Sequence, residues 1–378
     1  MKKELEADLN ELRAKGLARS LRVRDQADLV NFSSNDYLGL SMHPSVIAAA
    51  TQALTQFGAG GTASRLLAGT LPPHSELEAA LARFLSKEAA LVFSSGYHAN
   101  TGIIPALLGV GDIVFFDRLS HASIIDGVRL SGATFSAFHH NDMNDLSARL
   151  KKSRSKGRRA LVVTEGFFSM DGDRPPLKDV VRLAREWDAW VYLDEAHSLG
   201  VTGPEGKGLA AEEGLLGEID VHVGTLSKTL GSQGGFVAGS RLLVDTLISR
   251  CRSLAYTTAL APANAAAALQ ALRLLPDLTD SRQELSHASD LIRSALKAME
   301  YNCLQSASPI VPVLVGSVEA TRTLSDYLLS QGFFVPSIRP PTVPVGEGRV
   351  RLSISLPVLK HVNNLIEAFQ GGKIVASS

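Results

Sequence analysis

Residues 190–197 read Trp-Val-Tyr-Leu-Asp-Glu-Ala-His, and this stretch decides the fold class. Four apolar or aromatic residues give way abruptly to a carboxylate, Asp194, and three residues later to an imidazole, His197. A strand that is apolar throughout, instead of alternating with polar residues, is typical of a parallel sheet covered by helices on both faces. The stretch therefore predicts a buried strand that delivers polar groups at its carboxyl end.

The segments on either side repeat this pattern. Residues 180, 183, 184 and 187 are apolar at helical spacing just before the strand, and further apolar runs lie at 89–93, 113–116 and 160–164. Strand-like runs that alternate with helical segments indicate βαβ units on a mostly parallel sheet. We therefore predict an α/β fold.

The chain length predicts two domains and an N-terminal arm. At 378 residues the chain exceeds what one hydrophobic core usually organises. An Ala- and Leu-rich segment at 264–275 predicts a long helix that leaves the large domain, and 350–355 followed by 362–369 predict a strand and a closing helix. We predict an arm over 1–40, a large domain over 41–270 and a small C-terminal α+β domain over 271–378.

Composition excludes several classes of partner. Lys+Arg and Asp+Glu both number 38, so the net charge is zero and offers no general attraction for nucleic acid or acidic membranes. No run of about 18 apolar residues occurs, and the first residues lack the pattern of a signal peptide. The two cysteines have no close Cys or His companions. We expect a soluble, cytoplasmic protein.

Polar stretches follow three of these strand-like runs and a fourth apolar run at 221–223. In open α/β sheets ligands bind beyond the carboxyl ends of the strands, so these are the places where chemistry is expected. They are residues 94–100, 117–121, 194–197 and 225–228.

The groups in these stretches suit pyridoxal 5′-phosphate (PLP). Taken singly, Asp194 could be a helix cap, His197 a structural histidine and Lys228 a surface residue. PLP needs an amine for its aldehyde and an anion against its pyridinium nitrogen, which Lys228 and Asp194 provide. His197 suits the phenolic oxygen, and His121 suits stacking on the ring. Together these groups predict a PLP enzyme.

The phosphate of PLP needs backbone N–H groups at the start of a helix. Gly96 and Tyr97 lie where an apolar strand gives way to a predicted helix, and the hydroxyls of Thr225 and Ser227 could add donors. We predict that this segment binds the phosphate.

Rival motifs do not fit. The glycines at 203, 206 and 208 neither follow a strand nor open a clear helix, which argues against a dinucleotide-binding loop, and Lys207 is followed by glycine where a P-loop has Ser or Thr. His139 and His140 lack a third ligand at a recognisable spacing, so we predict no metal site.

At this point the ordered motifs resemble the α-oxoamine synthase family of fold-type I PLP enzymes over nearly the whole chain. The resemblance implies that Lys228 carries the cofactor, that Ser169 contacts it near His197, and that Lys228, His121 and Asp194 are catalytic. It also implies a homodimer with its active sites at the interface. The matching segments are residues 31–39, 95–97, 120–123, 164–172, 194–197 and 225–228.

Members of this family differ in their acyl donor and amino acid. Residues 338–344, Ile-Arg-Pro-Pro-Thr-Val-Pro, resemble the biotin-pathway members that join a pimeloyl thioester, on CoA or on acyl carrier protein, to L-alanine. By this resemblance Arg351 binds the amino-acid carboxylate, for which a guanidinium offers paired donors. The resemblance implies a substrate site completed by Arg22, Asn35, His121, Arg339 and Thr342.

Alternatives remain open at this point. A glycine C-acetyltransferase or another sister enzyme, a fold-type I aminotransferase and a non-catalytic subunit share the fold, although Lys228 argues against the last. The family's glycine-rich loop reads Gly-Gly-Thr-Ala-Ser-Arg at 60–65, with Thr62 and Ala63 in place of glycines. This difference restricts the loop backbone and bears on acyl specificity.

Overall fold

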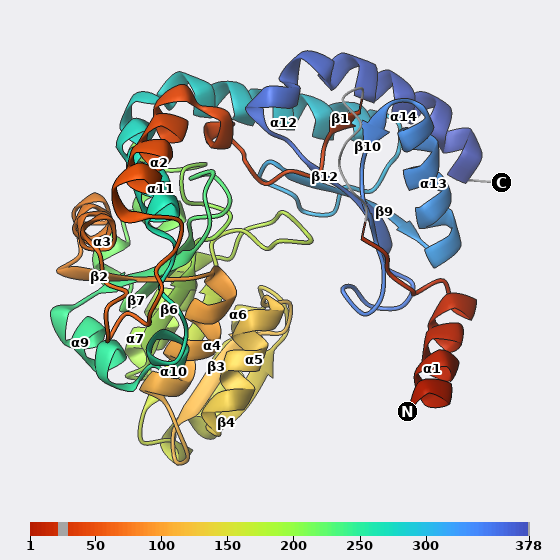
Figure 1. Ribbon diagram of the computed structural model, residues 1–378. Helices are drawn as coiled ribbons and strands as arrows, with labels where there is room; N and C mark the ends of the chain where they lie inside the picture. The colour runs from red at the N-terminus through yellow and green to blue at the C-terminus, as the bar shows by residue number, and fades with distance from the viewer. Residues whose placement is uncertain (22–28, 377–378) are drawn as a thin grey trace. The chain divides into compact units, whose positions relative to one another are not determined.

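The computed structural model describes residues 1–21 and 29–376, which form two compact units (Figure 1). The first unit comprises Met1–Asn35, Met170–Asp173 and Glu284–Ser378, and the second comprises Asp36–Ser169 and Arg174–Gln283. The N-terminal arm thus belongs to the same unit as the C-terminal segment. The chain passes to the C-terminal unit at 283/284, whereas the sequence placed this boundary at 270/271.

The second unit is built on a seven-stranded sheet in the order β2-β8-β7-β6-β5-β3-β4. Strand β8 is antiparallel to both of its neighbours, and the other adjacent pairs are parallel, so the predicted mostly parallel sheet is confirmed. The strands are β2 (Ala89–Phe93), β3 (Ile113–Asp117), β4 (Thr134–Phe138), β5 (Ala160–Glu165), β6 (Trp190–Asp194), β7 (Val221–Thr225) and β8 (Gly235–Gly239).

Helices cover both faces of this sheet, which explains why its strands are apolar on both sides (Figure 1). Helices α4 (Gly96–Leu107), α5 (Ala122–Ser131) and α9 (Arg241–Arg250) share one core cluster with Val163 and Tyr192. Helices α6 (Met143–Ser153) and α7 (Leu177–Glu186) share the other with Val162 and Val191. Because side chains alternate along a strand, Tyr192 and Asp194 both face α4 and α5.

The remaining helices of the second unit also bury apolar side chains. Helix α11, the predicted Ala-rich helix, packs against α2 and α3. These helices are α2 (Pro44–Phe57), α3 (Pro72–Phe84), α8 (Leu209–Glu212), α10 (Arg252–Ala255) and α11 (Pro262–Leu274). Short 3-10 helices lie at Leu40–Met42, Arg154–Lys156, Pro204–Gly206, Leu216–Glu218 and Leu275–Asp277.

The first unit contains a small antiparallel sheet in the order β11-β12-β9 and a short parallel pair, β1 with β10. The predicted strand near 350 is β12, and the predicted closing helix is α14. Helix α12 (Thr279–Ala298) begins in the second unit and ends in the first. The other elements are α1 (Lys2–Ala14), β1 (Val30–Asn31), β9 (Ile310–Gly316), α13 (Val318–Ser330), β10 (Phe333–Phe334), β11 (Ser337–Ile338), β12 (Gly348–Ser353), a 3-10 helix (Leu356–His361) and α14 (Val362–Ala376).

Among the described residues, no helix combines the length and the apolar character that a membrane span requires.

Candidate active site

Strands β2, β3, β5, β6 and β7 run in the same direction, so their carboxyl ends meet at one edge of the sheet. The register pairs Glu165 at the end of β5 with Asp194 at the end of β6. Thr225 ends β7, and Lys228 follows it in the next turn. The predicted polar stretches of the second unit therefore lie along a single edge, as parallel topology requires.

Asp194 is buried, with 6% of its surface exposed, and both of its carboxylate oxygens accept hydrogen bonds. The backbone N–H of Ala196 donates to Oδ1 at 2.9 Å, and the side-chain amide of Asn100 donates to Oδ2 at 2.8 Å. Charge-assisted bonds of this kind stabilise an ionised carboxylate in the interior. The side chain is thus held in one orientation before any ligand binds.

Lys228, His121 and Glu165 share the electrostatic environment of Asp194. Desolvation by the surrounding protein lowers the pKa of His121, while the charges of Asp194 and Lys228 act on it in opposite directions. Burial also raises the pKa of Glu165 well above its usual range, and the negative charge of Asp194 raises it further. Asp194 and Lys228 therefore lie close enough to His121 and Glu165 to influence the pKa of each.

His121 caps the N-terminus of α5 and is held through its backbone. Its N–H donates to Glu165 Oε1 at 2.5 Å, and its ring Nδ1 lies 2.7 Å from the hydroxyl of Ser123. The residue is exposed, as stacking on a planar ligand requires. The structure is thus consistent with the predicted stacking role.

The segment that the sequence predicts to bind the phosphate lies at the start of α4. Ser95 caps this helix by accepting the N–H of His98, and Gly96 is its first residue. A Cβ built on Gly96 would lie 3.4 Å from Thr225, so the start of the helix and the end of β7 adjoin closely. Tyr97 is exposed, and its hydroxyl donates to Asp126 of α5 at 2.5 Å.

His197 is buried, and its Nδ1 lies 2.7 Å from the hydroxyl of Tyr37. Tyr37 is fully buried and supports the imidazole from a segment far away in sequence. Ser169 is half-buried and is the last residue before the Met170–Asp173 segment of the first unit.

The first unit holds the predicted amino-acid-binding residues. Arg351 on β12 is 5% exposed, and its guanidinium nitrogens lie 3.3 and 3.4 Å from Asn35 Oδ1. Ser353 donates to the same oxygen at 3.1 Å. Arg349, two residues earlier, forms an ion pair with Asp171. The two arginines of this strand therefore have different partners.

A pocket of about 590 Å³ in the first unit contains the predicted acyl-binding residues Arg339 and Thr342. Arg19 Nη2 donates to Thr342 Oγ1 at 2.8 Å, and Arg339 donates to the backbone oxygen of Gly16. Desolvation lowers the pKa of Arg339 and the positive charges of Arg322 and Arg19 lower it further, while the charge of Asp326, which also lines the pocket, raises it. Such a cluster of cations suits an anionic ligand. Arg22 lies outside the described residues.

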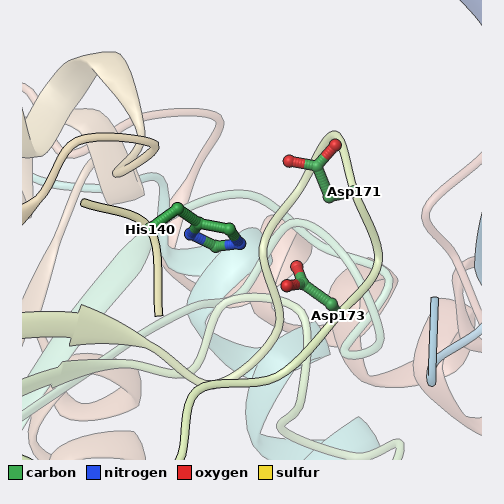
Figure 2. Close-up of side chains that lie close together, drawn as sticks. All are labelled: His140, Asp171 and Asp173. Carbon is green, nitrogen blue, oxygen red and sulfur yellow. The ribbon is translucent and has the colours of Figure 1, made fainter. Parts of the chain in front are cut away.

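The histidine that the sequence excluded as a metal ligand has a protein partner. Figure 2 draws His140, which belongs to the second unit, with Asp171 and Asp173 of the first. Within the second unit, His140 Nδ1 lies 2.9 Å from Asp117 Oδ1. We assign no metal to these side chains.

The loop that departs from the family pattern is strained at Thr62. This residue has φ +55°, a left-handed conformation that glycine adopts freely and β-branched residues do not. Arg65 anchors the end of the loop through an ion pair of 2.9 Å with Glu78 and a bond of 3.2 Å to the backbone oxygen of Val92. The loop thus keeps a glycine-like backbone without the glycine.

The donor set of the second unit fits PLP. Lys228 offers an amine, Asp194 a fixed carboxylate, His121 an exposed imidazole, and the start of α4 offers N–H groups beside Thr225. These are the groups that PLP chemistry uses, and they come from four different strand ends.

A family model described as aminotransferase class I and II matches residues 27–369, so the chain belongs to this family. The chain is 46% identical over 366 residues to 8-amino-7-oxononanoate synthase of Geobacter sulfurreducens, covering 94% of this chain and 93% of that protein. The predicted fold class and the predicted α-oxoamine synthase relationship are confirmed.

Two solved structures with related folds also match nearly the whole chain. A serine palmitoyltransferase from S. paucimobilis with bound PLP matches with a TM-score of 0.92 and 34% identity, covering 99% of this chain and 98% of that one. An 8-amino-7-oxononanoate synthase from Francisella tularensis matches with a TM-score of 0.78 and 27% identity, covering 93% and 98%.

Sequence reasoning gave no individual role to four residues that support the predicted site residues, either directly or, for Tyr192, through Asn100. Tyr192 could have been found, because it lies two positions before Asp194 and therefore on the same face of the strand. The other three lie in segments that the sequence singled out, but only the fold shows which side chains they contact. They are Tyr37, Asn100 and Glu165.

Proposed function

We propose that this chain catalyses the PLP-dependent condensation of a pimeloyl thioester with L-alanine, as a step of biotin biosynthesis. The products are 8-amino-7-oxononanoate, CO₂ and the free thiol. The convergence of Lys228, Asp194 and His121 at one sheet edge carries the proposal for PLP chemistry. The name of the Geobacter sulfurreducens relative, at 46% identity, supports the choice of substrates.

The reaction forms a bond between the alanine Cα and the acyl carbon, and it breaks the thioester C–S bond and the bond from Cα to the carboxylate. PLP, when bound, supplies an electron sink for the charge that develops at Cα. Lys228 would hold the cofactor through its amine, and the amine that alanine sets free by taking its place would move the proton at Cα. Asp194 keeps the pyridine nitrogen protonated, and His121 stacks on the ring and polarises the acyl carbonyl.

Further residues bind the cofactor in this proposal. Gly96, Tyr97 and Thr225 hold it at the start of α4 and the end of β7, and the adjacency of Gly96 and Thr225 supports this role. His197 and Ser169 contact the phenolic oxygen. The bond from Tyr37 to His197 would fix the direction of that imidazole.

The substrate groups are assigned by charge. Arg351, with Asn35 beside it, binds the alanine carboxylate through paired guanidinium donors. Arg339 and Thr342, together with Arg22, bind the distal carboxylate of the pimeloyl chain, and the cationic pocket supports this assignment. A site that pairs with this carboxylate should reject acyl chains that lack it, because its cations would be left unpaired.

The decisive experiment measures thiol and CO₂ release from a panel of acyl-CoAs and amino acids. We expect pimeloyl-CoA with alanine to exceed acetyl-CoA with glycine, and Lys228→Ala to serve as the inactive control. Equal or greater use of acetyl-CoA with glycine would instead identify a glycine C-acetyltransferase. Amino transfer to a keto acid without thiol release would identify an aminotransferase. A parallel assay with pimeloyl carrier protein identifies the preferred donor.

We also infer a homodimer. Leu5, Leu9 and Leu12 of α1 are 54%, 47% and 41% exposed, and an apolar stripe of this kind favours burial against a second copy. Sedimentation should give twice the chain mass. A monomeric active enzyme would contradict the inference.

The cytoplasm is the compartment we propose. Cys251 and Cys303 are both buried free thiols, as a reducing environment favours. Fractionation of cells that express a tagged chain tests this, and recovery of the chain outside the cytoplasm would contradict it.

A further inference from the structure

A chain of hydrogen bonds links the two groups that would contact the PLP ring. Asn100, the fifth residue of α4, is 2% exposed. Its amide nitrogen lies 2.8 Å from Asp194 Oδ2 and 2.9 Å from the hydroxyl of Ser123. The hydroxyl of Tyr192 donates to Asn100 Oδ1. Every polar atom of this buried amide therefore has a partner.

Tyr192 determines the orientation of this amide. Burial raises the pKa of its hydroxyl well above the usual range, and the charge of Asp194 raises it further, so the hydroxyl keeps its proton. It is fully buried, and its hydroxyl bonds to the carbonyl end of Asn100. The NH₂ end of Asn100 then faces the two acceptors on Asp194 and Ser123. A flipped amide would place its carbonyl oxygen against a carboxylate, at a cost of unsatisfied buried groups.

The series of hydrogen bonds continues from Ser123 to His121. Since Ser123 Oγ accepts a hydrogen bond from Asn100, its own proton is available for His121 Nδ1, which lies 2.7 Å away. The backbone N–H of Ser123 is directed at the same nitrogen, at 3.3 Å. Two donors directed at Nδ1 leave that nitrogen as an acceptor. A neutral imidazole must then carry its proton on Nε2.

We propose that Asn100 is a positioning residue that fixes the Asp194 carboxylate and, through Ser123, holds His121 as the neutral Nε2–H tautomer. In this form His121 can donate a hydrogen bond to a carbonyl oxygen but cannot donate from Nδ1. The proposal rests on the proposed function for the roles of Asp194 and His121 toward PLP. The hydrogen-bond chain itself belongs to the protein without cofactor.

The test is ¹⁵N NMR of protein labelled at histidine, with and without PLP, because imidazole ¹⁵N shifts distinguish protonated from unprotonated nitrogens. The His121 signals are those that disappear in His121→Asn. In the wild-type protein we expect Nε2 protonated and Nδ1 unprotonated. A protonated Nδ1 in the protein without cofactor would overturn the proposal.

Two variants separate the branches of the chain. Ser123→Ala keeps the bond from Asn100 to Asp194 and leaves only the longer backbone N–H contact of 3.3 Å at His121 Nδ1, so we expect a measurable Nδ1–H population of His121 with a PLP Kd within about threefold of wild type. Asn100→Asp has at most one proton to donate where the amide has two, so it cannot satisfy both acceptors, and we expect mixed tautomers and a Kd raised at least about tenfold, about 1.4 kcal/mol. Asn144→Asp, at an exposed position in α6, is the matched control and should change neither.

An unchanged tautomer in Ser123→Ala overturns the link to His121 even if Asn100→Asp fails to fold. A wild-type PLP Kd in folded Asn100→Asp overturns the link to Asp194. These results are distinguishable from failure of the proposed function, because loss of thiol release with every acyl-CoA would leave the tautomer in the cofactor-free protein unaffected.

Discussion

Asp194 and Glu195 are adjacent carboxylates, and we predict that substitution of Glu195 affects chiefly the stability of the second unit. Glu195 is fully buried, and it accepts the N–H of Ala210 at 2.8 Å and of His222 Nε2 at 3.0 Å. Nδ1 of His222 is buried with no partner in the described structure, which favours the proton on Nε2. Glu195 therefore satisfies two buried donors at once.

Glu195→Gln removes one of the two acceptors. If the imidazole proton moves to Nδ1 to compensate, that N–H is the donor left without a partner, because Nδ1 has none. Either way one buried N–H is unsatisfied, which costs about 1–3 kcal/mol. We expect the free energy of unfolding to fall by about this amount.

Urea unfolding followed by tryptophan fluorescence measures this directly. Both tryptophans, Trp187 and Trp190, lie in the second unit, so the signal reports that unit. Glu186→Gln is the matched control, because that carboxylate is 54% exposed and should contribute less than about 0.5 kcal/mol. If the free energy of unfolding of Glu195→Gln equals that of Glu186→Gln, the two hydrogen bonds to Glu195 do not stabilise the second unit as argued.

The same cluster explains one of the glycines near residue 205. A Cβ on Gly208 would lie 1.9 Å from Glu195 Oε2, and the residue has φ +94°. The absence of a side chain at Gly208 thus leaves room for the buried carboxylate of Glu195. We expect Gly208→Ala to destabilise the second unit in the same assay.

Three further predictions concern activity and pH. Lys228→Ala should abolish thiol release, and borohydride trapping of PLP on another lysine would remove Lys228 from its role. Arg339→Leu should lower the rate with pimeloyl-CoA at least about tenfold, about 1.4 kcal/mol, and Arg351→Leu should chiefly raise the KM for alanine. Steady-state kinetics with both substrates varied measures these effects. A rise in the KM for alanine in Arg339→Leu and a loss of pimeloyl-CoA turnover in Arg351→Leu would contradict the assignment. Burial raises the pKa of Glu165 above its ordinary 4.5. The contribution of this carboxyl to the free energy of unfolding is therefore fully present below pH 4.5 and is lost as the pH rises through the folded-state pKa. Glu165→Gln should therefore gain stability relative to wild type as pH rises above about 4.5, and a difference in unfolding free energy that stays constant with pH would contradict this.

The sequence alone determined the type of sheet and the edge at which the predicted site residues lie. A strand buried on both faces must be apolar throughout, and residues 190–193 show this directly. The polar residue that ends such a strand, Asp194, lies at the carboxyl edge whatever the rest of the fold does. The predicted fold and family are confirmed, and the PLP prediction agrees with the cofactor bound in the S. paucimobilis structure.

Only the tertiary structure decided which partners hold these groups. Asn100 and Asp194 are separated by 94 positions, and Tyr37 and His197 by 160, so no local periodicity could pair them. The units also differ from the predicted domains, because the N-terminal strand β1 pairs with β10, and strand pairing leaves no trace in local sequence. Hydrogen bonds between residues distant in sequence depend on how helices pack over the sheet, and that packing fixed the orientation of Asp194, the tautomer proposed for His121 and the buried position of Glu195.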